Sequence, residues 1–224
     1  MEAHIQEHRI HLITDRKQTK GDEATAVAAA LRGGVDVVQL RAKSGPALTL
    51  LETANEILPI AREHGAAVSI NDRLDVALAT NADGVHLAGK SLPPDVAREL
   101  WSGLLGVSVH SLEEAKSAAE AGVDYVTFGH VYPTSSKPGM APRGVRELAR
   151  IVAALDVPVL AIGGIEASNV GEVLATGASG VAVISTILAA KDPENAARKL
   201  REAANECKPP PKTPFPKTNE RSMP

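Results

Sequence analysis

The sequence has few aromatic residues and a single cysteine. Its 224 residues include one Trp, two Tyr and two Phe, so the core must be built from aliphatic side chains. One cysteine, Cys207, can form neither an intrachain disulfide framework nor a cysteine-rich zinc site. Because this pattern is typical of a reducing compartment, we expect a cytoplasmic protein; a secreted protein without disulfides is the alternative.

The chain also lacks an excess of charge of one sign and long apolar runs. The net charge is only -3, which gives no electrostatic reason to expect nucleic acid as a partner. No uninterrupted apolar run approaches the roughly 18 residues that span a bilayer, and the polar start, residues 1–9, has no signal-like segment. We therefore expect neither a nucleic acid nor a membrane as partner.

The last residues, 207–224, differ from everything before them. They are rich in Pro and Lys, carry the isolated Phe215, and show neither helical nor strand periodicity. Such a composition buries too little apolar surface to offset the entropy of ordering. The sequence predicts one domain, residues 1–206, followed by a disordered tail that does not pack. A proline-rich recognition peptide is the alternative interpretation of the tail.

Upstream of the tail, short aliphatic runs alternate with longer amphipathic, alanine-rich segments. Strands are predicted at residues 10–13, 35–40, 67–70, 84–87, 104–109, 125–128, 157–162 and 180–184. Helices are predicted at residues 24–32, 47–63, 74–80, 95–101, 112–121, 145–154, 167–175 and 193–204.

Eight strand-helix units in succession predict an α/β fold, the parallel (β/α)8 TIM barrel. An open doubly wound sheet is the alternative, but no G-x-G-x-x-G motif follows the first strand. In a barrel of this kind the reacting groups lie at the carboxyl ends of the strands. The residues just after each predicted strand are therefore the candidates for function.

Two candidate loops follow the seventh and eighth strands. Gly163 and Gly164 come after one strand, and Ile184 and Ser185 lie at the end of the other. Loops at these two positions commonly bind phosphate through backbone N–H groups, and glycine lets an anion approach the backbone closely. We expect a phosphate site here; the alternative is that the two glycines only make a tight turn.

Polar residues alternate with apolar ones after the second strand. The period of two in QLRAK places Gln39, Arg41 and Lys43 on one face, toward the barrel mouth. Two converging cations predict an anionic ligand, although Lys43 as a solvated loop charge is an alternative. Asn71, after the third strand, faces the same mouth, where it binds a ligand or caps the next helix together with Asp72.

The longest connection, residues 129–144, contains His130 where the sixth strand ends. A loop of this length in a compact domain is usually a lid or a binding loop. An imidazole can gain or lose a proton near neutral pH, so His130 is the candidate acid–base group. His110, in phase with Ser108 at the end of the fifth strand, is a second histidine at the mouth, whereas His11 and His86 are expected to be satisfied core residues.

From residues 9 to 204 the chain resembles a superfamily of phosphate-binding barrels of thiamine biosynthesis, which contains thiamine-phosphate synthase and thiazole tautomerase. The motifs that carry the resemblance are QLRAK, INDR, DGVHLAG, GVSVHS, DYVTFGHVYPTSSKPG, AIGGI and VAVIS.

The synthase typically has Asn-Asp-Asp after the third strand and Gln-x-Asp after the fourth, and the final aspartate of each motif holds Mg²⁺. Here the motifs are Asn71-Asp72-Arg73 and Gly89-Lys90-Ser91, so two cations stand where Mg²⁺ would bind, and we expect no metal site. Gly129-His130 replaces the usual Gly-Pro of the synthase and resembles the tautomerase.

The resemblance therefore implies a thiazole tautomerase, an isomerase that aromatises a carboxylated thiazole phosphate without a cofactor and with His130 as its base. A synthase and a non-catalytic binder of thiamine intermediates are the alternatives, and a homo-oligomer is left open. The implied phosphate ligands are Gly163, Gly164, Ile184 and Ser185, and the substrate contacts matched to the synthase are Arg41, Lys43, Asn71, Ser108, Thr134 and Lys137.

Overall fold

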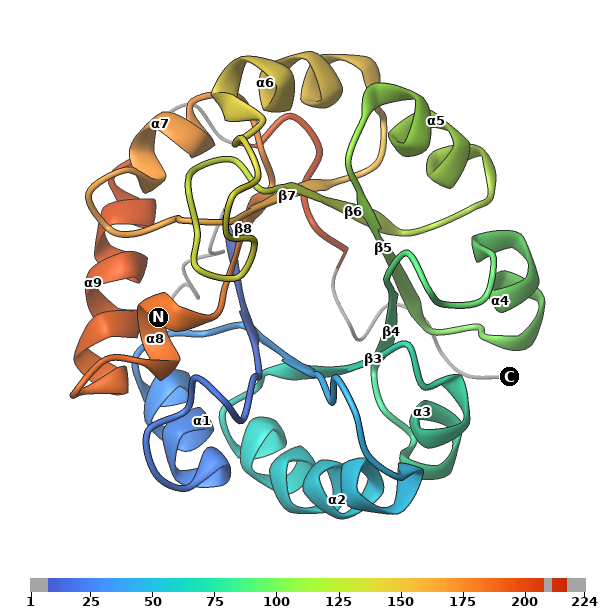
Figure 1. The fold of residues 1–224 in the computed structure, drawn as a ribbon, viewed down its shortest axis with the longest axis vertical. Coiled ribbons are helices and arrows are strands. Elements are labelled where there is room, and N and C mark those ends of the chain that lie inside the picture. Colours follow the sequence, from blue (N-terminus) through green and yellow to red (C-terminus); the bar gives the residue numbers. More distant parts are fainter. Residues whose placement is uncertain (1–7, 208–210, 217–224) are drawn as a thin grey trace, which may run out of the picture.

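The chain folds into a closed barrel of eight parallel strands in sequence order (Figure 1). The structure, a computed structural model, describes residues 8–207 and 211–216. The predicted (β/α)8 barrel is confirmed. Its strands are β1 (Arg9–Ile13), β2 (Val37–Leu40), β3 (Ala67–Asn71), β4 (Gly84–Leu87), β5 (Leu104–Val109), β6 (Tyr125–Gly129), β7 (Val159–Ile162) and β8 (Gly180–Val183).

Helices surround the barrel and join each strand to the next (Figure 1). A short helix, α8, precedes the last one and has no counterpart among the predicted helices. The helices are α1 (Glu23–Arg32), α2 (Ala47–Glu63), α3 (Leu74–Thr80), α4 (Pro94–Leu100), α5 (Leu112–Glu120), α6 (Gly144–Ala154), α7 (Val170–Leu174), α8 (Ser185–Leu188) and α9 (Pro193–Asn205).

The strands alternate between a helix-facing side and a barrel-facing side. On β2, Val38 and Leu40 are fully buried in the aliphatic layer beneath the helices. Gln39 lies between them, points into the barrel and is hydrogen-bonded to Asn71 of β3. The period-two prediction for this segment is confirmed, and it places the polar residues after β2 at the mouth.

The barrel interior near its amino-terminal end is filled by the Tyr125 ring. A Cβ at Gly106 on the neighbouring β5 would collide with that ring, so glycine is required there. Leu104 and Leu160 complete the cluster around Tyr125. Among the described residues, this plug of side chains fills the amino-terminal end of the barrel, opposite the mouth at the carboxyl ends of the strands.

Part of the C-terminal segment packs against that plug. Phe215 is 8% exposed and clusters with Leu104, Tyr125 and Leu160. Lys212 donates hydrogen bonds to carbonyls at and just beyond the end of α6, among them that of Leu155. The prediction of a tail that does not pack is therefore wrong for residues 211–216. Residues 208–210 and 217–224 lie outside the described residues.

None of the helices in the described ranges, 8–207 and 211–216, is both long and apolar enough to cross a membrane.

Candidate active site

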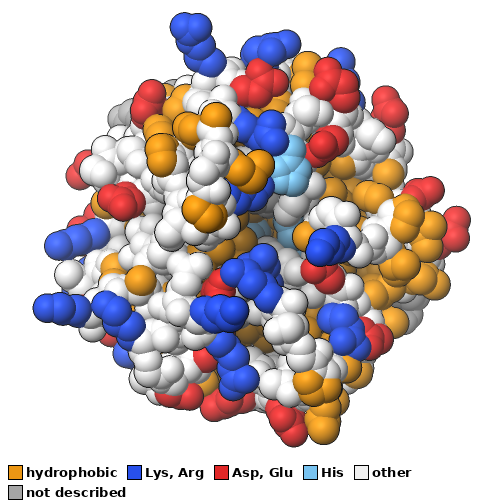
Figure 2. All heavy atoms as spheres, viewed as in Figure 1, with side chains coloured by type: hydrophobic (Ala, Val, Ile, Leu, Met, Phe, Trp, Pro, Cys, Tyr) orange, Lys and Arg blue, Asp and Glu red, His pale blue; other side chains and the backbone are white. Residues whose placement is uncertain are grey.

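A cavity of about 330 Å³ opens at the carboxyl ends of the strands. Lys and Arg side chains gather around the centre of this face in Figure 2. All eleven predicted site residues line the cavity, so the fold brings them together. They are Arg41, Lys43, Asn71, Ser108, His130, Thr134, Lys137, Gly163, Gly164, Ile184 and Ser185.

His130 lies in the cavity wall directly after β6 and is 3% exposed. Its Nε2 is 3.2 Å from the carbonyl oxygen of Met140 in the long loop. A carbonyl only accepts hydrogen bonds, so Nε2 carries the proton and Nδ1 is the basic nitrogen. Nδ1 is buried and has no hydrogen-bond partner among the described residues. A buried polar atom without a partner needs an explanation, and a catalytic role is one of them.

The Gly163-Gly164 turn packs against the long loop. Both glycines have a positive φ, 103° and 65° respectively. A Cβ on Gly163 would collide with His130, and one on Gly164 would collide with the carbonyl of Pro133. Glycine is therefore required at both positions so that the long loop can pack closely against the turn. The sequence predicted a phosphate site or a tight turn here, but not this contact.

Backbone donors of the same region remain available to a ligand. Among the described residues, the N–H groups of Gly163, Gly164 and Ile165 appear in no backbone or side-chain hydrogen bond. The N–H groups that begin α8, at Ser185 and Thr186, lie in a first helical turn, where no carbonyl of the same helix can accept them. The two loops thus present a group of N–H donors to one end of the cavity.

Two cations after β2 share a buried carboxylate that sequence analysis missed. Asp15, in the loop after β1, lies 2.6 Å from the Lys43 Nζ and 3.8 Å from the Arg41 guanidinium. Burial alone would raise the pKa of Asp15, but hydrogen bonds from Lys43 and from the Lys17 backbone hold this pKa below its usual value. The charges of Arg41 and Lys43 are therefore partly compensated before any ligand binds.

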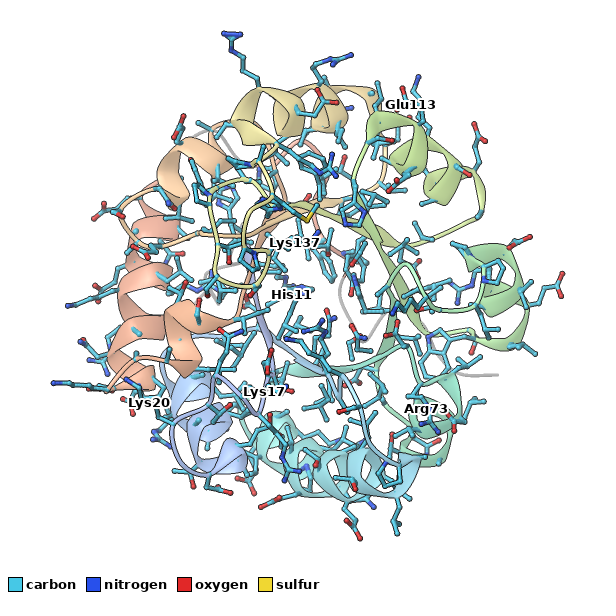
Figure 3. The ribbon with its side chains drawn as sticks, viewed as in Figure 1. His11, Lys17, Lys20, Arg73, Glu113 and Lys137 are labelled. Carbon is cyan, nitrogen blue, oxygen red and sulfur yellow. The ribbon has the colours of Figure 1, made fainter. Side chains whose placement is uncertain are left out.

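Asp72 directly follows β3, next to the lining residue Asn71, but is not itself among the described residues that line the cavity. It accepts hydrogen bonds from Asn71 Nδ2, from the backbone N–H of Ala88 and from the hydroxyl of Ser91. Arg73 instead pairs with Asp75, lines no part of the cavity and lies beside α3 at the rim of the molecule (Figure 3). The expectation that Arg73 repels a metal from the mouth is wrong, because the positive φ of Asp72, 61°, turns the chain there.

The donor set at the mouth fits Mg²⁺ poorly. Mg²⁺ in proteins is held by one or two carboxylates together with water and substrate phosphates. Asp72 already has three hydrogen-bond donors, and Asp15 is neutralised by Lys43 and Arg41. Across the described ranges there is no group of three or more His, Cys, Asp or Glu residues suited to a metal.

Histidines also lie beneath the cavity. His86 Nε2 is 2.8 Å from the Ser108 hydroxyl and its Nδ1 is 3.1 Å from the Tyr125 hydroxyl, so His86 is a satisfied core residue as expected. His11 packs edge-on against the rings of Tyr125 and Phe215, but its Nε2 has no partner among the described residues. The expectation that His11 is satisfied is therefore wrong.

Burial keeps both of these histidines neutral. It lowers the pKa of His11 to about 3, with smaller contributions from His86 and Arg9, and lowers the pKa of His86 to about 4. Both rings are therefore uncharged near neutral pH, and neither is among the described residues that line the cavity, which include His110 and His130.

Several residues that line the cavity were not predicted from the sequence as site residues. Thr127, on β6, and Thr186, at the start of α8, both line the cavity. The signal that could have found Thr127 is its spacing of two residues from Tyr125 and from Gly129, which places all three on the inner face of one strand.

Comparisons with known proteins agree on the family. A family model described as thiamine monophosphate synthase matches residues 10–187. A Geobacter sulfurreducens protein named provisionally as a thiamine-phosphate synthase is 48% identical over 195 residues, which is 85% of this chain and 92% of the relative. A thiamine-phosphate synthase of Pyrococcus horikoshii is 42% identical over 199 residues, 88% of this chain and 95% of the relative.

A solved structure shows the same fold. Thiamine phosphate pyrophosphorylase from Pyrococcus furiosus superposes with a TM-score of 0.83 at 39% identity, covering 90% of this chain and 97% of that one. Of the two activities implied by the sequence motifs, the names of these relatives favour the transferase over the isomerase.

Proposed function

This chain belongs to the thiamine monophosphate synthase family, and from that membership we propose that it is an enzyme whose substrate is a thiazole phosphate. Both activities of the superfamily that the motifs resemble use such a molecule. The cavity lining offers both backbone N–H donors and cationic side chains, which suits a ligand with a phosphate and a second anionic group.

Of the two reactions, the geometry best supports the isomerisation of a carboxylated thiazole phosphate to its aromatic tautomer. The observation that carries this choice is the His130 imidazole. It lies in the cavity wall, its Nε2 proton is directed to Met140, and its Nδ1 is left as a base with no other partner among the described residues.

In the proposed reaction, His130 Nδ1 takes the proton from the ring carbon C2. The electrons of that C–H bond enter the ring and make it aromatic, while the exocyclic double bond takes up a proton at its terminal carbon. The imidazolium that forms can return the same proton, so the reaction is balanced within the substrate and needs no metal, oxidant or reductant.

The remaining lining residues hold the substrate in this proposal. The N–H groups of Gly163, Gly164, Ile184 and Ser185 bind the phosphate, and the Gly163-Gly164 turn is held by its contact with the long loop. Asn71 and Ser108 are oriented by Gln39 and His86 respectively and contact the ring. Thr134 belongs to the long loop that borders the mouth.

Transfer of a pyrimidine group onto the thiazole phosphate is the second candidate, and the names of the relatives favour it. Arg41, Lys43 and Lys137 offer three cations to a pyrophosphate leaving group. Against this candidate, the activity needs a divalent cation to neutralise that group, and no Asp or Glu is among the described residues that line the cavity.

The experiment that tests the proposal compares wild type with His130→Asn. We expect the tautomerisation rate to fall by about 100-fold or more, with affinity for thiazole phosphate unchanged. His64→Asn, an exposed histidine at the end of α2, is the matched control and should keep the wild-type rate.

The same preparation is then given pyrimidine pyrophosphate, thiazole phosphate and Mg²⁺. Robust formation of thiamine phosphate would overturn the isomerase assignment in favour of the transferase. Tight binding of thiazole phosphate with no turnover in either assay is the result expected of a non-catalytic binder.

A further inference from the structure

His110, which the proposed reaction leaves unused, is in direct contact with Lys137. His110 follows β5, whereas Lys137 belongs to the long loop between β6 and α6 and extends over the mouth (Figure 3). The Lys137 Nζ lies 3.0 Å from His110 Nε2. Because an ammonium group only donates, Nε2 must be the unprotonated nitrogen, and the imidazole carries its proton on Nδ1.

Glu114 on α5 fixes this orientation of the ring. Its Oε2 accepts a hydrogen bond from the backbone N–H of His110 at 2.7 Å and lies 3.3 Å from His110 Nδ1. Glu114 is held near the start of α5, where Ser111 caps the helix through the Glu114 N–H. The three side chains form a chain of contacts, Glu114 to His110 to Lys137, from a rigid helix to a loop.

Lys137 differs in one respect from the other cations of the cavity. Arg41 and Lys43 both pair with Asp15. No ion pair within the described part of the chain includes Lys137, whose nearest partner is the neutral His110. The charge of Lys137 is therefore less compensated by direct ion pairs than the charges of Arg41 and Lys43.

We propose that His110 is a positioning residue that directs the Lys137 ammonium at the second anionic group of the substrate. This inference rests on the proposed function, in which that group is the carboxylate of the thiazole. It also selects Lys137 over Arg41 as the residue that recognises the carboxylate.

An imidazole suits this task better than a carboxylate would. A neutral acceptor can orient an ammonium group without cancelling its charge. The charged groups that face His110 are Glu114, Lys137 and Arg143; burial first, and then the Lys137 charge, lowers the pKa of His110 and favours the neutral ring. Burial and the charge of Arg143 likewise lower the pKa of Lys137.

The test is a calorimetric binding experiment with two ligands, the aromatic carboxylated thiazole phosphate and the thiazole phosphate that lacks the carboxylate. In His110→Phe we expect about fivefold weaker binding of the carboxylated thiazole phosphate, because one hydrogen bond is lost. Binding of the thiazole phosphate without the carboxylate should be unchanged. His110→Gln, which keeps an acceptor, should restore most of the affinity. His64→Phe is the matched control.

A double-mutant cycle separates positioning from a merely structural role. In a Lys137→Met background, His110→Phe should have no further effect on either ligand. Equal weakening of both ligands in His110→Phe, or a further loss in the Lys137→Met background, would overturn the proposal.

Inorganic pyrophosphate, a probe with two anionic groups, keeps this test independent of the proposed reaction. If wild type does not bind the carboxylated thiazole phosphate, the proposed function fails, and the cycle is repeated with pyrophosphate. Coupling between His110 and Lys137 in pyrophosphate binding would still support the positioning role, and additive effects of the two substitutions would overturn it.

Discussion

The ring of Phe215 packs on the ring of Tyr125 with their centroids 5.0 Å apart, and the two close the amino-terminal end of the barrel. Phe215 lies in the C-terminal segment, whereas Tyr125 is the first residue of β6. The contact ties the segment of residues 211–216 to the barrel interior.

Phe215→Ala should destabilise the protein by about 3 kcal/mol, the usual cost of removing a buried phenyl ring. The measurement is urea unfolding followed by circular dichroism. Phe215→Leu, which keeps most of the apolar volume, should cost less than about 1.5 kcal/mol. Equal stability of Phe215→Ala and wild type would show that this segment does not pack in solution.

Sequence analysis located the barrel elements closely because their periodicity is local. The predicted helices at Ala47–Glu63 and Leu74–Thr80 and the strand at Gly84–Leu87 agree with the structure to the residue. The packing of Phe215 was missed because its neighbours in sequence are Pro and Lys, while the partners that bury it are distant. Burial of an isolated aromatic residue depends on tertiary contacts that composition does not record.

The site was predicted where it follows from the rule that barrel chemistry lies at the ends of strands. That rule located the cavity residues, but it does not give side-chain direction. Arg73 was misplaced because Asp72 has a left-handed backbone that directs the next side chain outward. Asp15 was missed because its pairing with Lys43 joins the loops that follow β1 and β2 and leaves no pattern within either loop.

The buried histidines predict how stability depends on pH. The folded-state pKa values of His11 and His86, about 3 and about 4, lie below the unfolded value of 6.5. As pH falls below about 6.5, the unfolded state takes up protons that the folded state cannot, so the free energy of unfolding decreases until the folded pKa values are reached.

His11→Phe should therefore be less sensitive to acid than wild type. The substitution removes one titrating group and the unpartnered Nε2. The phenyl ring that replaces the imidazole can pack against Tyr125 and Phe215. The slope of unfolding free energy against pH should fall by about 1.4 kcal/mol per pH unit between roughly pH 4 and 6. Denaturant unfolding at a series of pH values measures it. A slope equal to that of wild type would contradict neutral burial of His11.

Metal removal separates the two candidate reactions. No Asp or Glu is among the described residues that line the cavity, and proton transfer by His130 requires no metal. The tautomerisation rate should therefore stay within about twofold of its initial value after dialysis against EDTA, since general acid–base catalysis uses the side chain alone. Loss of this activity on dialysis and its recovery with Mg²⁺ would contradict the proposed mechanism.

We predict that position 163 requires glycine for two reasons, its positive φ and the lack of room for a Cβ atom. The φ of Gly163 is 103°, and a Cβ there would collide with His130. Gly139, in the long loop that also contains His130, has a φ of 75° and open space around the Cβ position. Gly163→Ala and Gly139→Ala thus share the cost of a left-handed backbone, about 1–2 kcal/mol, and differ in the collision. We expect Gly163→Ala to lose about 1–3 kcal/mol more stability than Gly139→Ala, the usual cost of overpacking. It should also lose most of its activity, because His130 must move.

Thermal unfolding and the tautomerisation rate of both variants measure these losses. Similar behaviour of the two variants would show that His130 can shift without loss, and the tight contact between the Gly-Gly turn and the base would then have no role in the reaction.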